Sequence, residues 1–226
     1  MLERKYRPNL SDIAYDEIKE MILSGELAQG ERILLEKMSE KLNLSITPIR
    51  EALNKLAQDD LIRVNPRSSY EVISLDTDDI SDILDLREML ETFALRTMGE
   101  NLGQFPVQSF RDVFAKLKGT SNHRKFVEAD IKFHEVIVGL TKNQKLAKLY
   151  SYIRNPERLL MVPSARIESR MDQAIEEHQK ILDAIQKRDL DLTAKRLSAH
   201  IQKVKTLLLQ IHNHLMIIIN HNVRNL

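Results

Sequence analysis

Residues 22–62 have the sequence ILSGELAQGERILLEKMSEKLNLSITPIREALNKLAQDDLI, and this stretch decides the fold of the first part of the chain. Apolar residues recur at helical spacing in two short segments, one over residues 35–42 and one that begins near Ile46. Pro48 falls in the first turn of the second segment, where a helix tolerates proline. Two short helices joined by a tight turn are therefore predicted, and this is the pattern of a helix-turn-helix.

Elements on both sides extend this unit. A helix is expected from Ser11 to a stop at Gly25, because apolar residues recur every three or four positions before that glycine. Residues 61–64 and 70–73 are apolar or β-branched and flank a turn, so they predict a β-hairpin. A hairpin at this place is the wing of a winged helix-turn-helix. The first domain is therefore expected over residues 1–75.

The remainder of the chain predicts helices alone. A long helix is expected after a cap at Asp76 or Thr77. Five more are expected over residues 106–118, 122–140, 143–161, 168–187 and 190–220. The predicted fold class is mainly α: an N-terminal winged helix-turn-helix followed by an all-α antiparallel helical bundle over residues 76–226.

Composition limits the environment and the chemistry. With 226 residues, of which 42% are hydrophobic, the chain can form packed cores. It has no cysteine, so a metal would have to be held by His, Asp or Glu, and a cytoplasmic location is expected. No signal peptide is evident, and the late apolar run over residues 215–219 is too short to cross a membrane. The net charge of +1 does not indicate a nucleic-acid partner, so DNA binding must depend on local placement.

Both halves of the chain resemble known families. In the first half the likeness is carried by residues 24–27, Gly30, Ser45, Thr47, Pro48, residues 50–53, Leu61 and Ile62. These residues resemble the GntR family of bacterial regulators, although Ile46 stands where that family commonly has an arginine and Asp60 where it has a glycine. In the second half DILDLREMLETFALR, EADIKFHEVIVGLTKNQKL and EEHQKILDAIQKRDLDLTAKRLSAH resemble the ligand-sensing FCD domain. The resemblance implies a transcriptional regulator that is not an enzyme, with a double-stranded DNA operator as partner and a homodimer as the active form.

DNA contacts are expected at the start of the helix that begins near Ile46. A helix that enters the major groove needs polar or cationic groups there, and Ser45, Thr47 and Arg50 supply them. Arg50 can bind both acceptors of a guanine, so it is predicted to read a base. Arg67 lies at the tip of the wing, where a cation can enter the minor groove. The alternatives are that Ser45 is only a helix cap and Arg50 only a solvated residue.

A divalent metal site is expected in the helical half. Asp130 and His134 are four residues apart and so lie on one face of a helix. His178 and His200 each lie eleven residues from Asp189, where a helical hairpin is expected to turn, so their imidazoles should lie side by side. Three imidazoles and a carboxylate suit zinc first, and nickel, cobalt or manganese as well. The FCD pattern D-x-x-x-H…H…H falls on the same four residues, and the remaining histidines are expected to have ordinary roles.

Three further residues are candidates for ligand binding. Arg87 falls on the apolar stripe of its helix, and a buried arginine needs an anion. That anion is either a protein carboxylate or the carboxylate of a small effector, and the FCD resemblance favours the effector. Asn143 and Arg158 are weaker candidates, and Asn143 is an equally good helix cap. The alternatives for the whole chain are a metal-dependent hydrolase and a dimerisation domain with an empty metal site.

Overall fold

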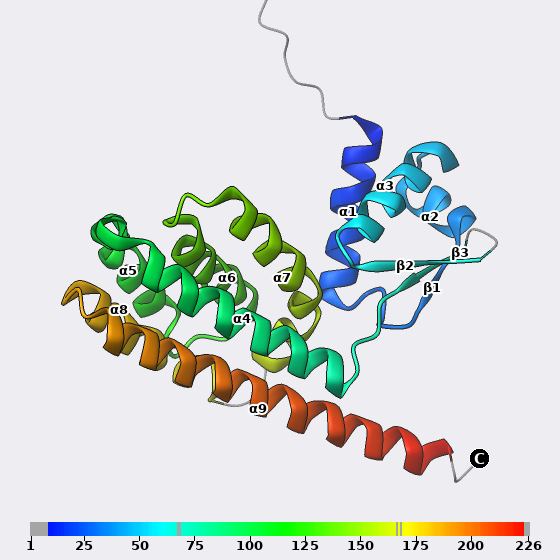
Figure 1. The fold of residues 1–226 in the computed structure, drawn as a ribbon. Helices are drawn as coiled ribbons and strands as arrows, with labels where there is room; N and C mark the ends of the chain where they lie inside the picture. The colour runs from blue at the N-terminus through cyan, green and yellow to red at the C-terminus, as the bar shows by residue number, and fades with distance from the viewer. Residues whose placement is uncertain (1–8, 67–68, 166, 168, 224–226) are drawn as a thin grey trace, which may run out of the picture. The chain divides into compact units, whose positions relative to one another are not determined.

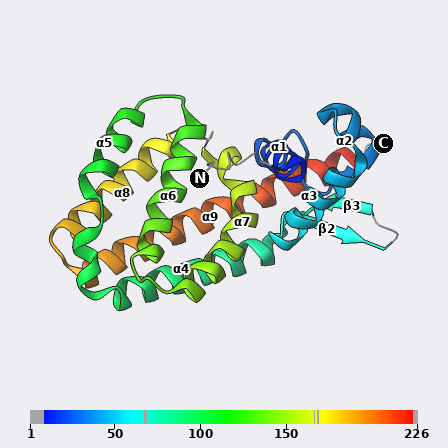
Figure 2. The ribbon, with the colours of Figure 1, turned by 90° about the horizontal axis from the view of Figure 1, so that it is seen from above.

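The structure, a computed structural model, describes residues 9–66, 69–165, 167 and 169–223. The chain divides after Leu75 into two units, residues 1–75 and 76–226 (Figures 1 and 2). Each unit has its own core of buried apolar side chains. No helix within the described residues combines the length and apolar character that a membrane crossing requires.

The first unit is built on a helix-turn-helix. Its helices are α1 (Leu10–Ser24), α2 (Leu35–Leu42) and α3 (Ile46–Gln58), and both α1 and α2 pack against α3. Gly25 closes α1 with φ of 82°, and Asn43 closes α2 with φ of 52°. Glycine and asparagine are the residues that adopt this left-handed conformation most readily, so these helix ends follow from the sequence. The predicted winged helix-turn-helix is confirmed.

The wing is part of a three-stranded sheet. β2 (Ile62–Asn65) and β3 (Ser69–Val72) form the predicted antiparallel hairpin, and both lie within one residue of their expected bounds. The additional strand β1 (Arg32–Ile33) pairs with the other side of β3, giving the order β1-β3-β2. A strand of two residues shows no periodicity, so the sequence did not predict it. Asp60, where the family pattern has glycine, has a left-handed φ of 57°.

The second unit is all-helical in the part that the structure describes. Its elements are α4 (Thr77–Thr97), the 3₁₀ helix η1 (Gly99–Gln104), α5 (Val107–Leu117), α6 (His123–Gly139), α7 (Gln144–Ala165), α8 (Arg170–Gln186) and α9 (Leu190–Val223). Asp76 is the predicted cap of α4, and with Asp79 it forms a reciprocal capping box. η1 was not predicted, and α7 continues four residues beyond its expected end.

The helices of this unit pack as an antiparallel bundle. α4 packs against α6, α7 and α9, while α5 packs against α6 and α8. α8 and α9 lie side by side after a tight turn, as Figure 1 shows. The centre of the bundle combines buried apolar side chains with an unusual number of buried charged ones. The buried polar and charged residues of this unit are Arg87, Glu91, Asp130, His134, Arg154, Glu157, His178, Thr193 and His200.

Candidate functional site

The start of α3 presents the predicted DNA-binding residues to solvent. Ser45, Thr47 and Arg50 are exposed, whereas Ile49 and Leu53 of the same helix are fully buried. Ser45 stands at the N-cap position, but its side chain makes no capping hydrogen bond, so its hydroxyl is not committed to the helix. Arg67 lies outside the described residues. Three polar groups therefore share one exposed helix end.

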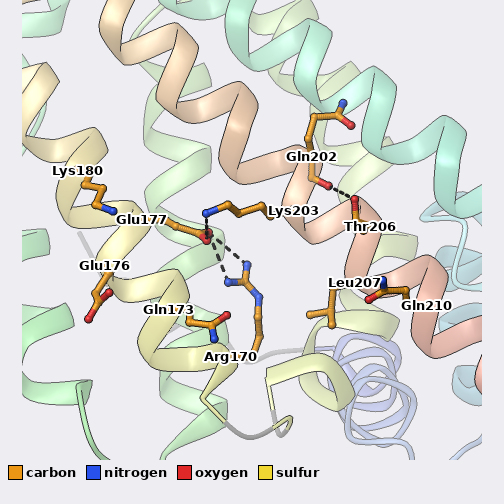
Figure 3. A pocket seen from close by; sticks show the side chains of 10 residues that line it. All are labelled: Arg170, Gln173, Glu176, Glu177, Lys180, Gln202, Lys203, Thr206, Leu207 and Gln210. Atoms are coloured by element: carbon orange, nitrogen blue, oxygen red, sulfur yellow. Dashed lines mark hydrogen bonds and ion pairs between the residues drawn. The ribbon is translucent and has the colours of Figure 1, made fainter.

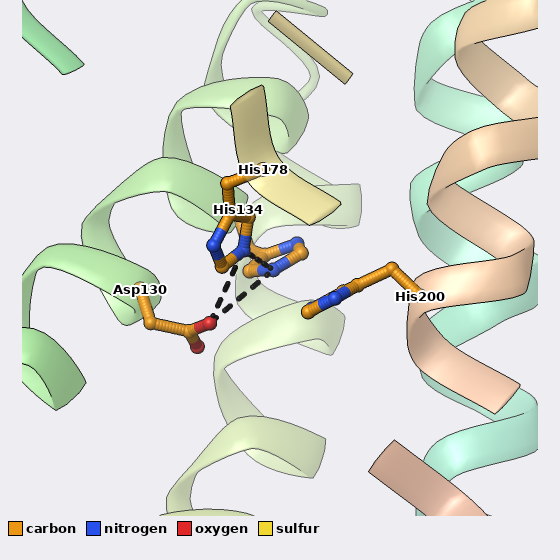
Figure 4. A group of neighbouring side chains, drawn as sticks. All are labelled: Asp130, His134, His178 and His200. Atoms are coloured by element: carbon orange, nitrogen blue, oxygen red, sulfur yellow. Dashed lines mark hydrogen bonds and ion pairs between the residues drawn. The ribbon is translucent and has the colours of Figure 1, made fainter. Parts of the chain in front are cut away.

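The four predicted metal ligands converge inside the helical unit. Asp130 and His134 come from α6, His178 from α8 and His200 from α9, and all four are buried (Figure 4). One potential ligand atom from each lies within 4.8 Å of the others. The Nε2 atom of His178 is 3.3 Å from both the Nε2 atom of His134 and the Oδ1 atom of Asp130. The spacing of these residues in the sequence had predicted two pairs, and the FCD resemblance had joined them in one site.

The two shortest distances within this cluster, both 3.3 Å, match those between the ligands of a tetrahedral ion, and the Nε2 atom of His134 and the Oδ1 atom of Asp130 are 3.8 Å apart. Ligand atoms at about 2.0–2.2 Å from a tetrahedral zinc lie about 3.3–3.6 Å from one another. The Nε2 atom of His200 and the Oδ2 atom of Asp130 are buried and have no hydrogen-bond partner among the described residues. Buried polar atoms are nearly always satisfied, so both atoms are available to an ion, and the Oδ2 atom of Asp130 also lies 3.7 Å from the Nη2 atom of Arg154. The cluster therefore fits a divalent cation.

The protonation states of the cluster favour metal binding. Burial, helped by the positive charge of Arg87, lowers the pKa of His134 well below its ordinary value. Burial also lowers the pKa of His200, to about 4. Burial alone would raise the pKa of Asp130, but the hydrogen bond from His178 and the nearby positive charges hold it well below its ordinary value. At neutral pH, His134 and His200 are uncharged and Asp130 is ionised, which are the forms that bind metals.

Two carboxylates orient the imidazoles. The Nδ1 atom of His134 donates to the Oε2 atom of Glu91 at 2.6 Å, and the Nδ1 atom of His200 donates to the Oε2 atom of Glu177 at 2.7 Å. A proton held on Nδ1 leaves the lone pair on Nε2, the atom of each ring that faces the cluster. Sequence analysis had not identified either carboxylate as a partner of a ligand.

His178 is held differently, by aromatic packing. Its ring stacks on Phe114 of α5 with centroids 4.7 Å apart and planes inclined by 3°. Phe133 packs against the same ring with centroids also 4.7 Å apart. The Nδ1 atom of His178 is buried and has no hydrogen-bond partner among the described residues. Aromatic packing, and not a carboxylate on Nδ1, therefore orients the outer side of this imidazole, while its Nε2 atom faces Asp130.

Glu177 connects the cluster to a groove between α8 and α9. Lys203 donates a hydrogen bond of 3.1 Å to its carboxylate, and Arg170 approaches it at 3.5 Å (Figure 3). The groove has a volume of about 470 Å³. Burial alone would raise the pKa of Glu177, but the hydrogen bond from His200 and the cationic neighbours lower it to about 2. The carboxylate that orients His200 is thus ionised at neutral pH and lies beside a surface groove.

Arg87 is fully buried, as the sequence predicted, and its partners are protein carboxylates. Its Nε atom donates to the Oε1 atom of Glu91 at 2.8 Å, and its Nη1 atom donates to the Oε1 atom of Glu157 at 2.6 Å. The hydroxyl of Tyr150 donates to the same Glu91 oxygen at 2.7 Å. Of the two anions that the sequence left open for Arg87, the structure therefore shows protein carboxylates. The Nη2 atom of Arg87 still has no hydrogen-bond partner among the described residues.

The two weaker ligand candidates have different surroundings. Asn143 is exposed, and its side chain accepts hydrogen bonds of 3.1 Å from the backbone N–H groups of Lys145 and Leu146. The structure thus gives Asn143 the capping role. Arg158 is half-buried and lines a cleft of about 210 Å³ between α6 and α7, where Arg154 also lies. Asn143 is not among the residues that line this cleft.

The fold and these sites define a class of protein, the winged-helix DNA-binding transcriptional regulators with a second, helical domain. Residues 10–72 match the family described as bacterial regulatory proteins, gntR family, and residues 82–203 match the FCD domain. The chain belongs to the FCD-domain branch of the GntR family of transcriptional regulators. It is a regulator and not an enzyme, since its relatives are named as transcriptional regulators and repressors.

Individual relatives agree with this assignment. The chain is 27% identical over 199 residues to the gluconate operon transcriptional repressor of Bacillus licheniformis, with 84% of this chain and 81% of the relative covered. The solved structure of Escherichia coli McbR/YncC has a TM-score of 0.72 at 19% identity, with 91% of this chain and all of that chain covered. A structure described as a metal-free FCD domain has a TM-score of 0.53 at 17% identity, with 61% and 96% covered. The likeness to both structures is one of fold.

Proposed function

We propose that the chain binds a two-fold DNA operator as a homodimer and that a small carboxylate effector, bound at a metal site in the helical domain, changes its affinity for the operator. The observation that supports this most directly is the buried convergence of Asp130, His134, His178 and His200. Three imidazoles and a carboxylate suit zinc first, and nickel, cobalt or manganese as well. A metal held by four protein groups can accept a further oxygen from water or an effector. Because DNA is the proposed partner, the protein works in the cytoplasm.

A carboxylate effector is favoured by the arginines near the cluster. Arg87 and Arg154 are buried beside it, and Arg158 lines the adjoining cleft. Guanidinium groups bind carboxylates through paired, charge-assisted hydrogen bonds. Gluconate, which appears in the name of one relative, is a monocarboxylate and is a suitable first probe.

The proposed function is tested by combining metal analysis with DNA binding. The purified full chain should contain about one divalent ion per protomer. Gluconate or acetate should change its affinity for an operator selected from random DNA, and a chelator should abolish that change while DNA binding persists. Loss of the metal without any change in the effector response would refute the role of the metal in sensing.

Arg50→Ala is predicted to remove specific operator binding while the fold persists, because Arg50 is exposed. A bidentate contact to guanine contributes about 1–3 kcal/mol in each half-site. Gel-shift titrations of the selected operator, at one fixed salt concentration, measure the loss.

Arg96→Ala is the matched control for this change. It removes the same charge from an exposed position in the last turn of α4, a helix of the second unit. We expect it to bind the operator like the wild type. Equal affinity of both variants would show that Arg50 does not read the operator.

An exposed apolar stripe on α4 supports the proposed homodimer. Leu86, Met89 and Phe93 are 42%, 54% and 48% exposed, and their spacing of three and four residues places them on one face of the helix. The inward face of the same helix carries Arg87 and Glu91. Large apolar side chains grouped at a surface are typical of protein interfaces, and a second copy of the chain is the occupant that we propose.

Phe93→Glu is predicted to convert the dimer into a monomer, because it places a charge within this stripe. Light scattering after size-exclusion chromatography measures the mass directly. Val113→Glu is the control, since Val113 is a 40% exposed apolar residue on a different helix, α5, and its variant should stay dimeric. An unchanged dimer in Phe93→Glu would place the interface elsewhere.

A further inference from the structure

Glu157 of α7 is a fully buried carboxylate shared by two buried arginines. Its Oε1 atom accepts a hydrogen bond of 2.6 Å from Arg87, and its Oε2 atom accepts one from Arg154. The Nη2 atom of Arg154 lies 3.7 Å from the Oδ2 atom of Asp130, one of the four clustered residues. The position between the two arginines would suit the carboxylate of an effector. In this chain the side chain of Glu157 occupies that position.

The two arginines can still donate hydrogen bonds to a further acceptor group. The Nη2 atom of Arg87 and the Nε atom of Arg154 are buried and have no hydrogen-bond partner among the described residues. Each guanidinium offers five N–H donors, and the protein carboxylates use only some of them. Because orphaned buried donors are costly, these atoms favour an additional anionic or polar ligand.

The charges of the buried network restrict what that ligand can be. Three carboxylates, those of Glu91, Glu157 and Asp130, face the two guanidinium groups of Arg87 and Arg154, which leaves one negative charge. Glu177 does not enter this sum, because its charge is compensated by Arg170 and Lys203 beside the groove. A divalent ion in the cluster would change this to one positive charge. A monoanion then makes the buried network neutral, whereas a dianion leaves an uncompensated buried charge, which is unfavourable.

We propose that Glu157 is a specificity-determining residue: its carboxylate occupies the anion position between Arg87 and Arg154 and restricts the effector to monocarboxylates. This inference rests on the proposed carboxylate effector and adds the effector's charge class. Removal of the Glu157 charge leaves the two arginines with uncompensated positive charge, which favours a ligand that carries a second carboxylate group.

Glu157→Gln tests the charge class with acetate and malonate as probes. Both ligands are titrated into the metal-loaded full chain, and the shift in melting temperature gives their affinities. Wild-type protein should prefer acetate. In Glu157→Gln the affinity ratio of malonate to acetate should rise by at least about tenfold, because one buried unit charge has been removed. Glu128→Gln, which removes a charge from the exposed surface of α6, should keep the wild-type ratio.

Glu157→Ala tests the anion position without metal or effector. In the chelated full chain, this variant leaves two buried arginines without their shared carboxylate, so added formate should raise its melting temperature more than that of the wild type. If Glu157→Ala does not fold, the affinity ratio in Glu157→Gln decides the question alone.

The outcomes separate this inference from the proposed function. An unchanged ratio in Glu157→Gln overturns the inference even if acetate stabilises the wild type, and the proposed effector function then stands. If no carboxylate stabilises the metal-loaded wild type, the proposed effector is wrong. A rise in the melting temperature of Glu157→Ala on addition of formate would still support an anion position between the two arginines. No such rise in the folded variant would overturn that position.

Discussion

Glu91→Ala is expected to lower the free energy of unfolding by about 3–5 kcal/mol, because it breaks a buried ion pair and leaves a charge uncompensated. The carboxylate of Glu91 accepts hydrogen bonds from Arg87, Tyr150 and His134, and none of these groups is exposed enough to find water instead. Denaturant unfolding of the chelated protein, with the slope checked for two-state behaviour, measures the loss.

Glu128→Ala is a matched control for this prediction. Arg124 and Glu128 form an ion pair at the same spacing of four residues as Arg87 and Glu91, but their side chains are 68% and 63% exposed. Exposed pairs contribute about 0–1 kcal/mol, so the control should be nearly neutral. Similar losses for the two variants would contradict the structure, since they would show that Glu91 is not desolvated.

The histidine cluster could be predicted because local geometry and the FCD resemblance point to the same four residues. Asp130 and His134 share a helix face by periodicity, and His178 and His200 face each other because both are equally far from the turn of one hairpin. The turn itself was predictable from the short polar stretch before Asp189. Helical period and hairpin geometry each bring two of the four residues together, and the FCD pattern D-x-x-x-H…H…H joined the two pairs in one predicted site.

The carboxylates around the cluster could not be predicted in the same way. Glu157 meets Arg87 only because α4 packs against α7, and the two residues are 70 positions apart in the sequence. Glu177 was visible as a neighbour of His178, yet it orients His200 of the next helix. Such contacts depend on how helices pack and which way they are rotated, and a single sequence does not encode these in a readable pattern. Glu91 had a local signal, since it lies one helical turn after Arg87.

His134→Ala is expected to reduce the bound metal from about one equivalent to nearly none, because it removes one of the three imidazoles. The four residues come from α6, α8 and α9, so a bound ion ties three helices together. Binding to the folded state alone stabilises it by about 4 kcal/mol when the free ion is a thousandfold above its Kd. Elemental analysis of the purified variants measures the metal, and melting curves measure the stability.

The comparison that isolates the metal is the effect of a chelator within each variant, since His134→Ala also leaves a cavity that lowers stability by itself. A chelator should lower the melting temperature of the wild type and leave that of His134→Ala unchanged. His123→Ala supplies the control on the same helix, because His123 lies outside the cluster and its variant should behave like the wild type towards both metal and chelator. A full equivalent of metal in purified His134→Ala would show that the four residues do not form the site.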